Sequence, residues 1–188
     1  MEENEVVFWT DAQIEATQAF LANGSLLWFY VRTAFLKTSI RDVTTIMKTM
    51  QFTSKWFLKM YTSGILIPPN FDFTFFLKGI KMLLDLDHGT STAKVLWLLY
   101  QILHVIPKKE REELIKYLLE PRIFYNLFFH WSWTVRMCFY YFYYFQLHRI
   151  LIDSKEVENE LHRSLTLQFS KIDQNIEDVK AERADNSG

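Results

Sequence analysis

The segment "FYNLFFHWSWTVRMCFYYFYYFQLHRIL", residues 124–151, constrains the fold more than any other part of the chain. Thirteen of its 28 residues are Phe, Tyr or Trp, so it must cross a membrane, line a site or lie in a protein core. Arg136 interrupts the apolar run, and Tyr is disfavoured at the centre of a bilayer. We interpret the segment as a central helix that its neighbours cover on most sides.

Hydropathy elsewhere also argues against a membrane span. The longest run without Asp, Glu, Lys or Arg covers residues 16–31, which is 16 residues, and "NGS" breaks it. A spanning helix needs about 18 or more apolar residues. A peripheral contact with a membrane stays open. The acidic N-terminus, "MEENEVVFWTD", lacks the basic and apolar regions of a signal peptide, so a cytoplasmic location is expected, with membrane association as an addition to it.

The chain contains few residues that break helices. Its 188 residues include only five Gly and four Pro, which favours long helices over a many-stranded sandwich. Short gaps between helices force neighbours to pack antiparallel, so we predict an all-α fold of stacked antiparallel helical hairpins over residues 1–152. The predicted helices span residues 10–23, 25–36, 39–50, 54–63, 73–84, 90–106, 108–119, 121–129 and 133–152. A buried strand is the alternative for residues 25–36.

Local signals mark several helix ends and one break. Ser25, Asp42, Thr90 or Ser91, and Ser132 are the predicted caps. Pro68 and Pro69 make "ILIPPN" extended, because each fixes φ and lacks an amide donor. The inward stripes are predicted to be Phe73, Phe76, Leu77, Ile80, Leu83 and Leu84 in one helix, and Val95, Leu98, Leu99, Ile102, Leu103 and Ile106 in the next.

The tail has a different pattern from the rest of the chain. Residues 153–180 are predicted to form a C-terminal amphipathic helix, and residues 181–188 a disordered end. Its apolar residues fall three or four apart in a narrow seam of the coiled-coil kind: Val157, Leu161, Leu165, Phe169, Ile172, Ile176 and Val179. This seam either lies along the body of the same chain or serves for docking or self-association.

Candidate catalytic and metal-binding groups are few. Asp85, Asp87 and His88 gather in "LDLDHG", but their spacing at a helix end does not make them converge, so a helix terminus is the favoured interpretation over a metal site. Cys138 has no orienting carboxylate nearby, because residues 121–152 contain no Asp or Glu. We interpret it as a small buried hydrophobe, and expect no cofactor and no enzyme activity.

Arg136 is the most informative charge. In so aromatic a helix it either projects from a polar face or stacks on rings, since a buried guanidinium without an acceptor costs several kcal/mol. We expect its partner to come from another helix or from another protein. Together with His130 and Trp131 it is a candidate partner-binding surface, as are Leu161, Leu165, Phe169, Ile172 and Ile176 of the tail.

Residues 70–152 resemble an uncharacterised eukaryotic family found in fungi, slime moulds and amoebae. The resemblance rests on an Asp-His pair, a Lys-x-x-x-x-x-Tyr helix, the element Leu-Phe-x-His-Trp-Ser-x-x-Val-Arg, and an aromatic helix closing on Arg-Ile. In this sequence those positions are Asp87, His88, Lys94, Tyr100, Leu127, Phe128, His130, Trp131, Ser132, Val135, Arg136, Arg149 and Ile150. The resemblance implies an armadillo-like helical fold, and it implies no catalytic residues.

The expected function is therefore a non-enzymatic helical scaffold or adaptor that binds protein partners. The net charge of −1 gives no overall attraction to nucleic acid, so none is expected as a partner. A peripheral membrane adaptor is the alternative, and an enzyme with an unrecognised site is a distant third.

Overall fold

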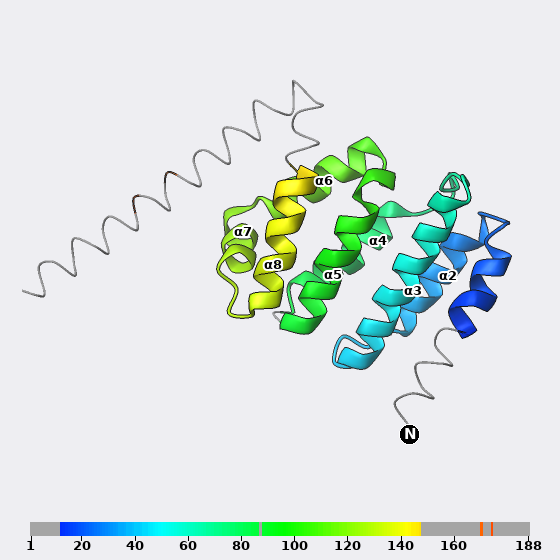
Figure 1. Cartoon of the computed structure of the whole chain (residues 1–188), viewed down its shortest axis with the longest axis horizontal. Coiled ribbons are helices and arrows are strands. Elements are labelled where there is room, and N and C mark those ends of the chain that lie inside the picture. Colours follow the sequence, from blue (N-terminus) through cyan, green and yellow to red (C-terminus); the bar gives the residue numbers. More distant parts are fainter. Residues whose placement is uncertain (1–11, 87, 148–169, 171–173, 175–188) are drawn as a thin grey trace, which may run out of the picture.

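The computed structural model describes residues 12–86 and 88–147, together with residues 170 and 174 (Figure 1). Residues 12–20 are helical. The α-helices that follow are α2 (Leu26–Lys37), α3 (Val43–Thr62), α4 (Phe73–Leu84), α5 (Gly89–Ile102), α6 (Lys108–Leu118), α7 (Pro121–Phe128) and α8 (Trp133–Tyr141). A 3-10 turn, η1 (Leu103–Val105), extends α5, and a π-helix, η2 (Phe142–Leu147), extends α8. No strand occurs among the described residues, so the all-α prediction is confirmed, including helix rather than strand over residues 25–36.

The helices form two layers. α5 lies between α3 and α8 in one row, while α2, α4, α6 and α7 form a second row behind it (Figure 1). Connections of four or five residues join α2 to α3, α4 to α5 and α7 to α8. Each of these pairs places one helix in each row, a packing compatible with a helical-repeat fold.

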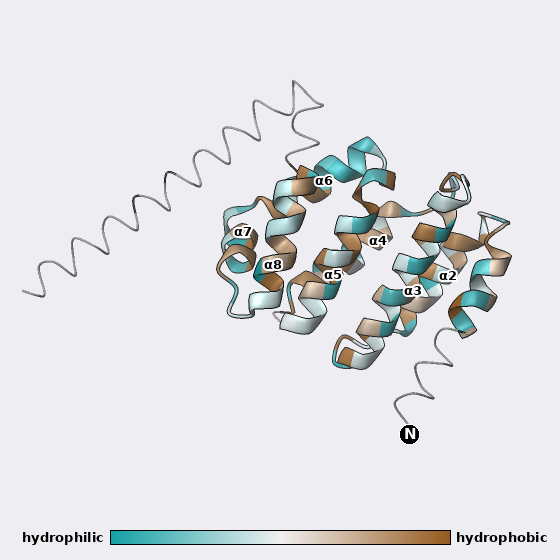
Figure 2. Ribbon diagram, viewed as in Figure 1, coloured by the Kyte–Doolittle hydropathy of each residue, from teal (hydrophilic) through white to brown (hydrophobic). Residues whose placement is uncertain are grey.

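The core lies between the two rows. Every residue of the predicted inward stripes is buried except Phe73, which is half-buried. α6 is amphipathic, as predicted, and Figure 2 shows how strongly its surface is hydrophilic. Its apolar residues Leu114, Ile115 and Leu118 are buried.

Helix ends follow the predicted chemistry only in part. Asp42 caps α3 by accepting a hydrogen bond from the N–H of Thr45 at 3.2 Å, and it accepts a second from the Thr45 hydroxyl. The hydroxyl first, and then the N–H, lower the pKa of its carboxyl. The predicted caps Ser25 and Ser132 precede their helices, but their side chains make no cap hydrogen bond. α5 is capped by a residue that was not predicted, because the Nδ1 of His88 accepts from the N–H of Ser91 at 3.3 Å.

Two predicted helices are one in the structure. The sequence predicts separate helices over residues 39–50 and 54–63, yet α3 runs without a break from Val43 to Thr62. Thr53 is fully buried inside it, so tertiary packing overrides the weak helix preference of Thr. α3 is followed by Gly64, whose φ of 66° is a left-handed conformation suited to glycine. The segment predicted to be extended, residues 65–70, lies outside any helix: residues 65–68 have no regular secondary structure and residues 69–70 form a turn.

The aromatic segment differs most from its prediction. Its helix is α-helical only to Tyr141 and continues as the π-helix η2 to Leu147; residues 148–152 of the predicted helix lie outside the described residues. α8 lies at the end of its row, beside α5 and α7 (Figure 1). Val135, Phe139, Phe142 and Leu147 are buried, but Tyr141, Tyr144 and Phe145 are exposed, so the prediction that neighbours cover it on most sides is wrong. Within the described part of the chain, no helix combines the length and apolar character that crossing a membrane requires.

Candidate functional site

Three large aromatic side chains are exposed where α7 passes into α8: two lie in the connection and one is the first residue of α8. Phe129 is 59% exposed, Trp131 73% and Trp133 62%. We call residues 129–133 the aromatic loop. Exposed rings so close together are uncommon on a protein surface and typically mark a binding site.

Arg136 fixes the shape of this loop. Its Nη1 donates hydrogen bonds to the carbonyl oxygens of His130 and of Trp131, the second at 3.1 Å. Its guanidinium also lies over the Trp133 ring, 5.4 Å from the ring centroid. Of the two predicted alternatives for Arg136, the structure shows stacking on a ring within the fold. Its acceptors in this chain belong to the loop just before its own helix and not to another helix, and a partner from another protein stays a prediction.

Buried and half-buried side chains hold the aromatic loop against the rest of the protein. His130 is buried, and its Nδ1 accepts a hydrogen bond from the N–H of Ser132 at 3.0 Å. The hydroxyl of Tyr140 donates to the carbonyl of Phe128 at 3.0 Å, which satisfies a carbonyl at the end of α7. Phe124 and Phe139 make an edge-to-face contact with ring centroids 5.6 Å apart. The aromatic loop is therefore held in one conformation.

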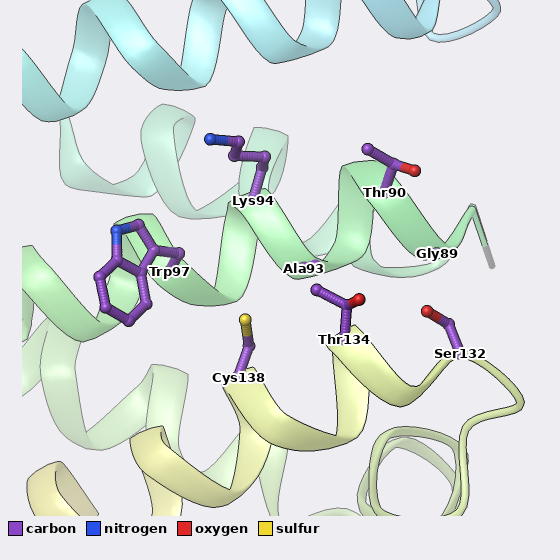
Figure 3. A pocket seen from close by; sticks show the side chains of 8 residues that line it. All are labelled: Gly89, Thr90, Ala93, Lys94, Trp97, Ser132, Thr134 and Cys138. Carbon is purple, nitrogen blue, oxygen red and sulfur yellow. The ribbon is translucent and has the colours of Figure 1, made fainter.

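A trough of about 330 Å³ runs beside the loop, between α5 and α8 (Figure 3). Ala93 and Trp97 line it from α5, and Thr134 and Cys138 reach toward it from α8. At one end α5 approaches the loop closely: a Cβ on Gly89 would lie 3.0 Å from the Cβ of Ser132 and 3.3 Å from the Trp131 ring. Glycine therefore allows two segments more than forty residues apart in sequence to meet here.

Trp97, which lines the trough, belongs to an aromatic pair: it stacks on Tyr100 with ring centroids 5.2 Å apart. A second pair joins α8 to η2, where Tyr141 stacks on Phe145 at 5.8 Å. The side-chain amide of Gln146 donates to the carbonyl of Tyr100 at 2.9 Å. That carbonyl is one of the last four of α5, which lack partners within an α-helix, so η2 is joined to the end of α5.

Of the candidate metal ligands, the two that the structure describes, Asp85 and His88, have other partners. Asp85 accepts hydrogen bonds from the Tyr117 hydroxyl at 3.2 Å and from Arg122 at 3.5 Å, while His88 caps α5. Asp87 is outside the described residues. In the ranges 12–86 and 88–147, no three His, Cys, Asp or Glu side chains come together as metal ligands would.

The thiol of Cys138 faces the trough and is half-buried (Figure 3). Burial raises its pKa, and the nearby Lys94 opposes that rise. Because the thiolate is the reactive form, burial makes this cysteine less nucleophilic, which agrees with its interpretation as a small hydrophobe.

The structure brings together three predicted partner-binding residues, Arg136, His130 and Trp131, although His130 is buried and only supports the loop. The other five, Leu161, Leu165, Phe169, Ile172 and Ile176, lie outside the described residues. Sequence reasoning missed the exposure of Phe129 and Trp133. The signal was present in "HWSW", since a break between two helices places adjacent rings on the surface.

Comparison with known proteins gives one match. Residues 29–147 match the family described as "Protein of unknown function (DUF1765)". The matched range begins well before residue 70, where the sequence resemblance was recognised. No curated protein and no solved structure shows significant similarity to the chain.

Proposed function

We propose that this chain, which belongs to the DUF1765 family of proteins of unknown function, is a non-enzymatic helical scaffold that binds protein partners. The observation that carries this proposal is the aromatic loop. Arg136 holds the backbone of this loop through two carbonyl oxygens and lies over the Trp133 ring, so ordering the loop costs little conformational entropy when a partner covers its three exposed rings. Trp and Arg are also the residues most often found at the energetic centre of protein interfaces.

The finer features of the proposal follow the sequence resemblance. We place the chain among armadillo-like helical proteins of eukaryotes, with the hallmark Leu-Phe-x-His-Trp-Ser-x-x-Val-Arg at residues 127–136. Stacked helical hairpins suit partner binding because they present long, rigid surfaces. A cytoplasmic location fits a chain with one cysteine. The tail seam, residues 157–179, is a second contact element, for a partner or for another copy of the chain.

Affinity purification of the full chain from its native cells tests the proposal. The double variant Trp131→Ala/Trp133→Ala is expected to lose at least tenfold of the recovered partner protein in quantitative mass spectrometry. Phe20→Ala/Phe29→Ala is the matched control, because both rings are equally exposed on other helices. Deleting residues 155–188 tests the tail separately. An unchanged partner set in both the loop variant and the deletion would contradict the proposal.

A peripheral membrane adaptor is the second candidate, favoured by the same exposure of Trp131 and Trp133. Trp prefers the interface between lipid headgroups and acyl chains. Sedimentation with liposomes distinguishes the two functions. Binding that survives high salt, needs no protein partner and is lost in Trp131→Ala/Trp133→Ala would support the membrane function over the scaffold.

A further inference from the structure

The net charge of −1 conceals a strong separation of charge. Residues 12–86 and 88–147 contain fifteen Lys and Arg but eight Asp and Glu. The remaining acidic residues lie in the N-terminal eleven residues, at Asp87 and in the tail after residue 152. The helical body is therefore basic, although the whole chain is nearly neutral.

Within the body, several basic residues lie on elements that contain no acidic residue. α3, α5, α8 and η2 contain no Asp or Glu themselves, but they carry Lys48, Lys55, Lys59, Lys94 and Arg136. The nearest acidic residues to α3 are its cap, Asp42, and Glu15 of the helix at residues 12–20, which hydrogen-bonds to α3. The ion pairs between described residues all belong to the row of α2, α4, α6 and α7 or its connections: Lys81 with Glu113 at 2.8 Å, Lys108 with Glu112 at 3.9 Å and Arg122 with Asp85 at 3.5 Å. Among the described residues, no ion pair neutralises the lysines of α3 or α5.

The trough lies between two of these helices, α5 and α8. Lys94 is its one charged lining residue and is exposed, and its side chain rises from α5 on the side toward α3 (Figure 3). Ala93, Trp97 and Cys138 give the trough an apolar depth, and Thr90 and Thr134 add exposed hydroxyl groups at its edges. Its volume is within the range of about 300–1,000 Å³ that ligand sites occupy.

We infer that the trough between α5 and α8 is the docking site for an acidic peptide segment of a protein partner. An aliphatic or aromatic side chain of that segment fills the trough, and its carboxylates face the lysines of α5 and α3. Charge complementarity of this kind speeds association and excludes basic segments. The inference rests on the proposed function, because it names the chemistry of the partner that the scaffold binds.

A nucleic acid fits this surface less well. Phosphate recognition relies on many Lys and Arg side chains along the path of the backbone. Here Lys55 and Lys94 stand on separate helices, and the guanidinium of Arg136 is already engaged with the loop carbonyls. Trp97, the exposed ring in the trough, is stacked on Tyr100 along one face, which limits the stacking of bases.

Selection of a random dodecapeptide library displayed on phage, with the full chain as bait, tests the inference. We expect enriched peptides to combine Asp or Glu with Leu, Phe or Trp. Affinities of the enriched peptides, made synthetically with a fluorescent label, are then measured by polarisation. Thr134→Trp should weaken binding at least tenfold by filling the trough, and Lys94→Glu should weaken it several-fold and reduce its salt dependence. Thr74→Trp and Lys78→Glu make the same changes at exposed positions of α4, and should leave binding unchanged.

The other outcomes separate this inference from the proposed function. Absence of enriched peptides, enrichment without an acidic bias, or binding indifferent to Thr134→Trp and Lys94→Glu would overturn the trough as an acidic-peptide site. The scaffold function would still stand or fall on the partner set of the aromatic-loop variant. Tighter binding of a 20-nucleotide poly(U) than of any enriched peptide, lost in Lys94→Glu, would overturn the inference in favour of nucleic acid.

Discussion

Arg136 donates a hydrogen bond to the carbonyl oxygen of His130, six residues earlier in the chain. The carbonyls after α7 have no partners within that helix, and the first turns of α8 pass directly beside them. A guanidinium on α8 therefore satisfies them and holds the aromatic loop in place. This contact explains how an arginine belongs in so aromatic a segment without a carboxylate nearby.

Removing the hydrogen bonds of Arg136 should destabilise the aromatic loop and the two helices that it joins, α7 and α8. Arg136→Met is expected to lower the free energy of unfolding by about 1.5–3 kcal/mol, the usual contribution of hydrogen bonds to charged groups. Arg136→Lys should recover only part of it, because an ammonium does not reproduce the planar guanidinium over Trp133. Urea denaturation measures both changes. An Arg136→Met variant as stable as the wild type would show that the contact contributes nothing.

The two faces of the aromatic helix should respond differently to truncation. Phe139 is fully buried, so Phe139→Ala is expected to cost about 3–5 kcal/mol. Phe145 is 58% exposed, so Phe145→Ala should change stability by no more than about 0.5 kcal/mol. Thermal or urea unfolding followed by circular dichroism compares them. Equal costs would mean that both faces are covered, as the sequence alone had predicted.

The Phe35 ring packs so close to Gly79 that a larger residue at position 79 should destabilise the protein. A Cβ at Gly79 would lie 2.6 Å and 2.8 Å from two carbons of the Phe35 ring. Alanine is favoured over glycine inside a helix by about 1 kcal/mol, yet Gly79→Ala should destabilise the protein by about 1–2 kcal/mol because of this overlap. In the Phe35→Ala background, the same substitution should become stabilising. A double-mutant cycle measures this coupling, and additive effects would contradict it.

Tyr117 should make the stability of the folded protein depend on pH in the alkaline range. Burial, followed by the charge of Asp85, raises the pKa of the phenol from 10.0 to about 12. Because the folded-state pKa is the higher one, the contribution is fully present below pH 10, where both states keep the proton. It is lost as pH rises toward about 12, because the unfolded chain ionises first. The difference in free energy of unfolding between wild type and Tyr117→Phe should be constant from pH 8 to 9.5. By pH 11.5 the wild type should have lost stability relative to the variant, as urea denaturation at each pH would measure.

Within the described residues, local sequence patterns determined the helices well. The stripes of α4 and α5 repeat every three or four residues, and each of their predicted inward positions is buried or half-buried. Pro121 begins α7, and Gly64 and the two prolines after it mark the break between α3 and α4. These features depend on neighbouring residues in the chain, so the sequence displays them directly.

The aromatic helix could not be placed in the same way. Seven consecutive aromatic residues, 139–145, give rings on every face, so the pattern carries no information about which face is buried. The position of α8 at the end of its row decides that Phe139 is inside and Phe145 outside. Periodicity identifies a helix, but only the neighbours of that helix decide which of its sides they cover.

The candidate site shows the same division. The sequence by itself determined an all-helical chain with a break at "HWS", and with an arginine that needs acceptors. Tertiary structure decided that Gly89 meets Ser132, that Arg136 satisfies the loop before its own helix, and that three helices without acidic residues, α3, α5 and α8, lie side by side. These relationships join segments that are distant in the sequence or depend on the angle between packed helices, and no local pattern of residues specifies either.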